Sequence, residues 1–158
     1  MDNLKRSDSM PTSFFPPGTY DLFITHAWRY TDEWQQMVGL LDDYLPGKWR
    51  NWSIPWHDTS IDRYSDEGKD KLTQLLSGHI SMSSAIILLP ELIRTSGGEI
   101  WLDIQLTIAG QLVKPVIGVL PLDRGRFSVA LRDKVKEIVP RDAAQIVRAV
   151  ERLSAHPK

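Results

Sequence analysis

The sequence contains no cysteine. This absence excludes disulfide bonds, thiolate nucleophiles and thiolate metal sites, and it fits a reducing compartment. The chain also lacks an apolar run long enough to cross a bilayer, so no membrane partner is expected. Residues 1–9 lack the apolar segment of a secretion signal. We therefore expect the protein to stay in the cytoplasm.

No excess of charge of either sign is present. The chain of 158 residues has 19 basic and 20 acidic residues, and its formal net charge is -1. No overall field recruits nucleic acid, so a nucleic-acid partner is not expected. An apolar content of 42% at this length fits one folded domain, which we expect over residues 19–158. Prolines in the first 18 residues predict a disordered or extended arm there.

Common catalytic and phosphate-binding motifs are missing as well. The turn after the apolar run at residues 20–25 has no glycine, which excludes a glycine-rich phosphate loop at this place. No Gly-x-Ser-x-Gly elbow occurs, which argues against a hydrolase of that kind. His26 and His57 fall in expected loops but have no acidic partners at ligand spacing, so no metal site is expected.

Short apolar runs alternate with helical patterns along the chain. The expected strands cover residues 20–25, 49–54, 85–89, 116–120 and, at an edge, 135–139. Helical spacing predicts helices that begin at Thr31 or Asp32, near Asp66, around Trp101 and after Pro140. This alternation predicts a parallel sheet with helices on both faces. Ligands of such sheets bind beyond the carboxyl ends of the strands, here at the loops that start at Thr25, Pro55 and Pro90.

Gln105 is the most informative polar residue. Trp101, Ile104 and Ile108 recur at spacings of three and four, which is the pattern of a helix that buries one face. Gln105 lies four residues after Trp101 and therefore on the same side. An amide there needs hydrogen-bond partners, so it is either tied to neighbouring backbone or directed into a pocket.

Five of the six tryptophans fall into two groups. Trp34, Trp49 and Trp101 stand in helical or strand patterns and are expected to pack in the core. Trp28 and Trp56 follow strand ends among polar neighbours. For these two, contact with a ligand or partner and ordinary half-burial are both open.

Three stretches together resemble the TIR-like proteins of bacterial Thoeris antiphage defence, over roughly residues 20–155. They are residues 20–28 (YDLFITHAW), residues 52–58 (WSIPWHD), and Trp101-x-x-x-Gln105 leading to residues 114–119 (KPVIGV). The resemblance implies a flavodoxin-like α/β fold with about five parallel strands. In that family a glutamate four residues after a tryptophan cleaves the bond between nicotinamide and ribose in NAD.

The chain departs from this family at one position, because Gln105 stands in the place of the glutamate. Loss of nicotinamide leaves positive character on the ribose, which a carboxylate stabilises and an amide does not. Since acid–base catalysis alone contributes about a hundred- to ten-thousand-fold, we expect severely impaired turnover in a chain that still folds. A natural loss of activity and an isosteric substitution that traps substrate or product are both open explanations.

The resemblance also implies a site and partners. NAD is expected as a substrate, with no resident cofactor, and the ADP-ribose-derived product is expected to activate a separate effector protein. Self-assembly into a homo-oligomer is a further expectation. Gln105 marks the catalytic position, and the residues expected to line the pocket are Phe23, Thr25, His26, Trp28, Arg29, Trp56, His57, Asp58 and, by orienting residue 105, Trp101. The alternatives are a TIR-type association module without catalysis and a nucleotide sensor that binds without turnover.

Overall fold

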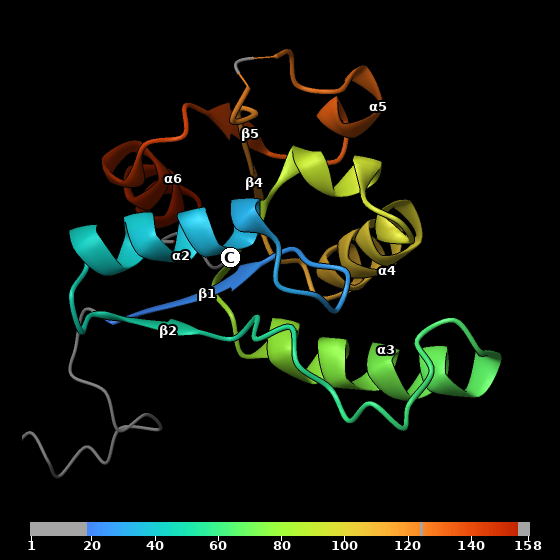
Figure 1. Cartoon of the computed structure of the whole chain (residues 1–158). Helices are drawn as coiled ribbons and strands as arrows, with labels where there is room; N and C mark the ends of the chain where they lie inside the picture. The colour runs from blue at the N-terminus through green and yellow to red at the C-terminus, as the bar shows by residue number, and fades with distance from the viewer. Residues whose placement is uncertain (1–18, 124, 155–158) are drawn as a thin grey trace, which may run out of the picture.

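The computed structural model describes residues 19–123 and 125–154. The arm expected over residues 1–18 lies outside the described residues. In chain order the elements are β1 (Tyr20–Ile24), α2 (Asp32–Tyr44), β2 (Trp49–Asn51), α3 (Asp66–Ser81), β3 (Ala85–Leu88), the 3-10 helix η1 (Pro90–Arg94), α4 (Gly98–Gln111), β4 (Val116–Val119), α5 (Val129–Arg132), β5 (Glu137–Val139) and α6 (Ala143–Ser154) (Figure 1).

The strands form one sheet in the order β2-β1-β3-β4-β5, and every neighbouring pair is parallel. This is the flavodoxin-like order of a doubly wound sheet, so the expected fold class is confirmed. The order reverses between β1 and β3, where the loops after these strands part to opposite sides. In such folds this reversal marks the ligand-binding edge.

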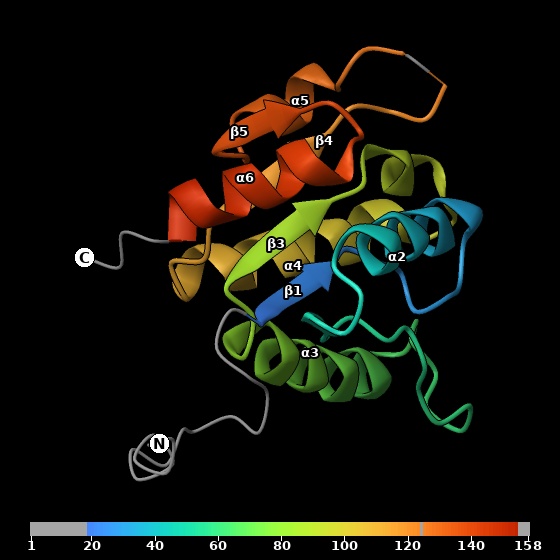
Figure 2. The same ribbon diagram turned by 90° about the vertical axis from the view of Figure 1, so that its left-hand side faces the viewer.

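Helices cover both faces of the sheet (Figures 1 and 2). The helices α2 and α6 pack on one face, where their apolar side chains join Leu22, Ile24 and Ile87 in one core cluster. The helices α3 and α4 pack on the other face with Phe23 and Ile86 in a second cluster. Side chains of β1 therefore point alternately into the two core clusters, as the pleat of a strand requires.

The start of α4 is packed closely against η1. Gly97 takes a left-handed conformation with a φ of 74°, and Gly98 follows as the first residue of the helix. A Cβ at Gly98 would lie 1.8 Å from the carbonyl oxygen of Leu92, so only glycine fits there. This close approach fixes the position of α4 and, with it, the position of Gln105.

Several boundaries differ from those expected. The strand expected over residues 49–54 ends at Asn51, because the Asn51 side chain accepts the amide of Ser53 at 2.9 Å and replaces the strand ladder with a turn. The edge strand is likewise shorter than expected and begins at Glu137. The stretch after Pro90 forms η1 rather than an open loop, and α5 was not expected. Among the described residues, no helix has the length and apolarity needed to span a bilayer.

Candidate functional site

Gln105 lies on α4 and is fully buried at the carboxyl end of β1. Its Oε1 accepts the backbone N–H of His26 at 3.0 Å. Its Nε2 donates to the carbonyl oxygens of His26 at 2.7 Å and Trp101 at 2.6 Å. Of the two alternatives for this amide, the structure shows the first, because the side chain is tied to neighbouring backbone.

The pattern of donors and acceptors around Gln105 matches a carboxamide. The group must accept one hydrogen bond and donate two, and an amide has the acceptor oxygen and the two N–H donors for this task. An ionised carboxylate has no donor. We call this arrangement the Gln105 clamp, since it joins α4 to the first loop, residues 25–31 between β1 and α2.

His26 is a neutral imidazole in this loop. Its Nδ1 accepts the backbone N–H of Trp28 at 3.0 Å, which places the ring proton on Nε2. Burial, together with the nearby His79 and His57, lowers the pKa of His26 to about 3. The buried Nε2 finds no hydrogen-bond partner among the described residues. His26 therefore offers an unused N–H donor and carries no charge at neutral pH.

Trp28 is the central aromatic residue of the site and is only 3% exposed. Its indole meets the rings of His26, His57 and Trp101 edge to face, with ring centroids 4.8, 5.5 and 6.1 Å away. Its backbone has a φ of 61°, in the left-handed region that bulky residues avoid. The indole Nε1 is buried and has no acceptor in the described part of the chain.

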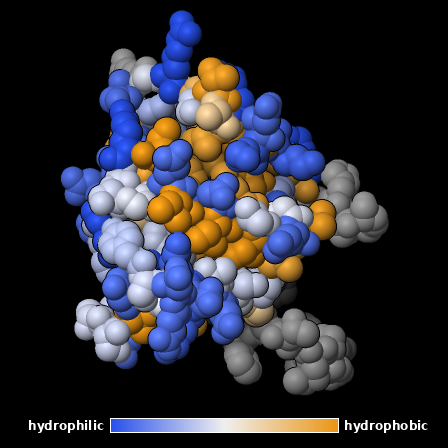
Figure 3. Space-filling view, turned by 90° about the vertical axis from the view of Figure 1, so that its right-hand side faces the viewer, coloured by the Kyte–Doolittle hydropathy of each residue, from blue (hydrophilic) through white to orange (hydrophobic). Residues whose placement is uncertain are grey.

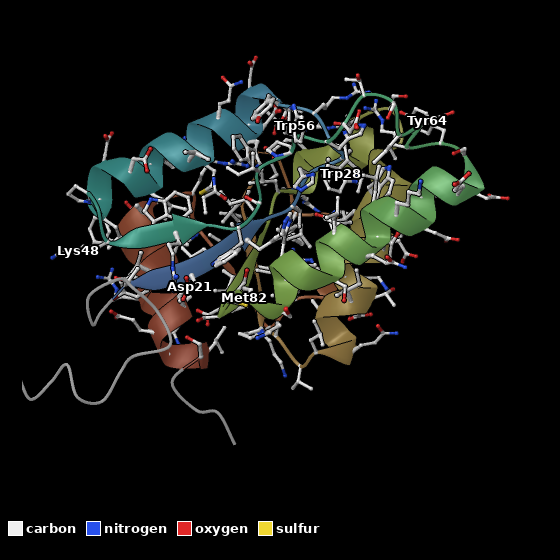
Figure 4. The ribbon with its side chains drawn as sticks, turned by 90° about the horizontal axis from the view of Figure 1, so that it is seen from below. Asp21, Trp28, Lys48, Trp56, Tyr64 and Met82 are labelled. Carbon is white, nitrogen blue, oxygen red and sulfur yellow. The ribbon has the colours of Figure 1, made fainter. Side chains whose placement is uncertain are left out.

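The second loop, residues 52–65 between β2 and α3, closes over this cluster. From it, His57 packs against Trp28, and Nη1 of Arg63 donates to the Trp28 carbonyl oxygen at 3.4 Å. The Arg63 guanidinium also lies 4.9 Å from the ring centre of Tyr64. The nearby Arg63 lowers the pKa of the Tyr64 hydroxyl, and the charge of Arg29 adds to this effect. Figure 4 shows Trp28, Trp56 and Tyr64 at this end of the molecule.

The structure gathers six of the expected site residues: Phe23, His26, Trp28, His57, Trp101 and Gln105. It places Trp56 outward, with 67% of its surface exposed. Asp58 is exposed as well, and its carboxylate accepts the amide of Ser60, which lowers the pKa of Asp58. Arg29 is half-buried within the first loop. Thr25 is buried at the end of β1, where its hydroxyl accepts the amide of Leu89 at 3.0 Å.

Sequence reasoning missed a buried ion pair at the same edge of the sheet. Glu91 and Arg141 meet at 2.6 Å, and both side chains are 7% exposed. The same carboxylate oxygen accepts the amide of Leu122 at 2.7 Å, and Nε of Arg141 donates to the carbonyl oxygen of Leu120 at 3.0 Å. The pair thus joins the loops that follow β3, β4 and β5. The only signal for it in the sequence is the acid directly after a buried strand and Pro90.

Hollows of very different size occur at the two edges of the sheet. At the carboxyl edge, Thr25, Glu33 and Glu91 line a space of only about 10 Å³. At the amino edge, Ser83, Lys114 and other residues line a space of about 750 Å³. Gln105 lines neither of them. The candidate site is therefore a packed cluster in this conformation.

A third hollow, of about 250 Å³, lies between α4 and α5 and is lined by Leu102, Leu106 and Leu131 together with charged residues. Figure 3 shows apolar side chains gathered on the side of the molecule where these helices lie. Within residues 19–123 and 125–154, no group of three or more His, Asp or Glu side chains is arranged to hold a metal ion.

Comparison with known proteins adds little to this geometry. No protein-family model matches the sequence, and no curated protein matches it. One similar solved structure is the CMP N-glycosidase BcmB of Clostridium botulinum, with 14% sequence identity and a TM-score of 0.46. The match covers 83% of this chain and 98% of that chain. A likeness of this size carries no argument about function.

Proposed function

We propose that this chain is a TIR-like domain of the Thoeris type of antiphage defence, which binds NAD at the carboxyl edge of its sheet. The family reaction breaks the bond between nicotinamide and ribose, and its ADP-ribose-derived product activates a separate effector. In this chain the reaction is impaired, because the position of the family glutamate holds Gln105.

The position of Gln105 carries this proposal. The side chain lies four residues after Trp101, and it reaches from α4 to the backbone of His26 at the end of β1. A carboxylate at this place would lie beside the loop that bounds the ligand edge in such sheets. There it would stabilise the positive ribose that remains when nicotinamide leaves. The amide of Gln105 has no charge to offer.

The surroundings fit an anionic nucleotide with flat rings. The guanidinium groups of Arg29 and Arg63 both act on Tyr64, so two cationic side chains at the rim of the site are available to a phosphate group. Aromatic side chains from the first loop, the second loop and α4 give stacking surfaces for a pyridine or purine ring. NAD is the substrate here, and no resident cofactor is part of the proposal.

Nicotinamide release from NAD tests this function. We expect little release by the wild-type protein and at least ten-fold more by Gln105→Glu once the new carboxyl group is ionised. The matched control is Gln74→Glu, which makes the same change at an exposed position of α3 and should leave the rate at the wild-type level. Equal rates in all three proteins, with no NAD binding by calorimetry, would refute the proposal.

Two observations favour a second candidate, a TIR-type module that binds or associates without turnover. Every hydrogen-bonding group of the Gln105 amide is engaged with backbone, and an apolar hollow lies open between α4 and α5. Saturable binding of NAD or ADP-ribose without product, before and after Gln105→Glu, would identify a sensor. Concentration-dependent self-association that Leu106→Glu abolishes, with no nucleotide binding, would identify an association module.

A further inference from the structure

The centre of the aromatic cluster formed by His26, His57 and Trp101 is occupied by the indole of Trp28. The indole of Trp28 is 3% exposed and stands edge to face against His26, His57 and Trp101. These partners come from the first loop, the second loop and α4, the segments that meet at the ligand edge. An indole therefore sits where the fold would place a flat ligand ring.

The backbone at Trp28 is under strain in this arrangement. A φ of 61° is an outlier for a bulky residue, because the side chain then crowds the following carbonyl group. Such conformations persist where the surroundings enforce them, and they cluster at functional sites. The Arg63 bond to the Trp28 carbonyl and the His26 bond to its amide are the contacts that hold this residue.

The cluster also contains two unused donors. Nε2 of His26 and Nε1 of Trp28 are both buried, and neither has an acceptor within the described residues. Buried N–H groups of native proteins are nearly always paired, so each exception needs an explanation. A ligand with a carbonyl oxygen would supply the acceptor that the His26 N–H lacks.

We propose that the indole of Trp28 occupies the seat of a ligand ring, and that the seat takes a flat heteroaromatic ring with a carbonyl substituent when Trp28 turns outward. The seat is bounded by His26, His57 and Trp101. The outward turn relieves the left-handed backbone, and the carbonyl oxygen on the ring that replaces the indole accepts the His26 N–H. Only the identification of that ring as the nicotinamide of NAD rests on the proposed function.

Removal of the indole tests the seat directly. In Trp28→Ala, the truncation opens an apolar hollow of indole size, and such hollows bind matching small molecules. Calorimetry with nicotinamide alone should show binding at least ten-fold tighter than to the wild-type protein. Benzene lacks the carbonyl acceptor and cyclohexanecarboxamide lacks the flat ring, so both should bind more weakly than nicotinamide.

The matched control is Trp34→Ala, which removes a buried indole from the other face of the sheet. It should gain no preference for nicotinamide over benzene. If Trp28→Ala does not fold, Trp28→Phe keeps most of the bulk, and nicotinamide should then raise its melting temperature more than that of the wild-type protein. No gain in either Trp28 variant, or an equal gain in Trp34→Ala, would overturn the proposal.

The outcome is separable from that of the NAD test. Nicotinamide binding by Trp28→Ala without nicotinamide release by Gln105→Glu would support the seat and refute the enzymatic function. Release by Gln105→Glu without binding by either Trp28 variant would support the function and refute the seat.

Discussion

Replacement of Gln105 by glutamate should make the stability of the protein fall as the pH rises. The new carboxyl group would keep the place of the amide, and one of its oxygens would still accept the His26 amide. The other oxygen would take the place of Nε2, which lies 2.7 Å from the carbonyl oxygen of His26 and 2.6 Å from that of Trp101. The second carboxylate oxygen would then face two carbonyl oxygens, and none of these three atoms could donate a hydrogen bond.

A proton on the new carboxyl group relieves this conflict, because the O–H donates to one of the two carbonyl oxygens. Burial and the facing oxygens favour the protonated form, so the pKa of the group in the folded protein rises above the ordinary glutamate value of about 4.3. The folded state then holds a proton that the unfolded state has released. Stability is therefore lost with rising pH, by about 1.4 kcal/mol for each pH unit, until the folded-state pKa is reached.

The magnitude follows from these two steps. At about pH 4 the variant should lose only the hydrogen bond to one carbonyl oxygen, which lowers its free energy of unfolding by about 1–3 kcal/mol. Between about pH 5 and about pH 7 its free energy of unfolding should fall by about 3 kcal/mol more, relative to that of the wild-type protein. If the Gln105 clamp opens before the protein unfolds, the group ionises in the folded protein, and activity should rise over the same pH range.

Urea unfolding of the wild-type protein and of Gln105→Glu, repeated at several pH values, measures this difference. Gln74→Glu is again the matched control and should show a profile parallel to that of the wild-type protein. If the profile of Gln105→Glu also ran parallel, with a loss below about 1 kcal/mol at pH 8, the hydrogen-bond pattern assigned to Gln105 would be wrong.

Three further predictions concern other parts of the structure. Because burial lowers the pKa of His26 to about 3, wild-type stability should fall below pH 6.5, by about 2 kcal/mol at pH 5; thermal melts of His26→Asn, whose oxygen still accepts the Trp28 amide, should lose this part of the slope. Arg141→Met should cost about 3–5 kcal/mol in urea unfolding, because it leaves the Glu91 carboxylate buried without its partner; a loss typical of exposed pairs, under about 1 kcal/mol, would contradict this. Val113 has a φ of 56° just after α4, where glycine is the usual residue. Val113→Gly should therefore raise the free energy of unfolding in urea by about 1 kcal/mol, and a lowered value would show that no strain is stored there.

The fold was predictable because its signals are local. Residues 85–88 form a continuous apolar run, which is the pattern of a strand covered on both faces, and they are the central strand β3. The N-cap at Thr31 follows from the chemistry of a hydroxyl before a helix, and its Oγ1 accepts the amide of Trp34. Where a side chain competes with the strand ladder, as Asn51 does, pattern reasoning placed the boundary too late.

The candidate site was predictable only in part. The spacing of Gln105 from Trp101 located the amide on the core side of α4, but its main partner, His26, lies 79 positions away, which no periodicity reveals. Trp28 and Trp56 stand in similar local sequence, yet one is buried and the other exposed. Their difference depends on Arg63 and His57, which reach Trp28 only through the tertiary fold.

The ion pair of Glu91 and Arg141 has a consequence for redesign of this protein. It fastens the connections after three neighbouring strands into one unit, so an insertion or exchange in any of them would strain the other two. The loops after β1 and β2 take no part in that ion pair, and the neutral Gln105 clamp and the Arg63 bond are among the contacts that hold them. Libraries that seek a new ligand preference should therefore vary residues 54–64 and leave Glu91, Leu122 and Arg141 untouched.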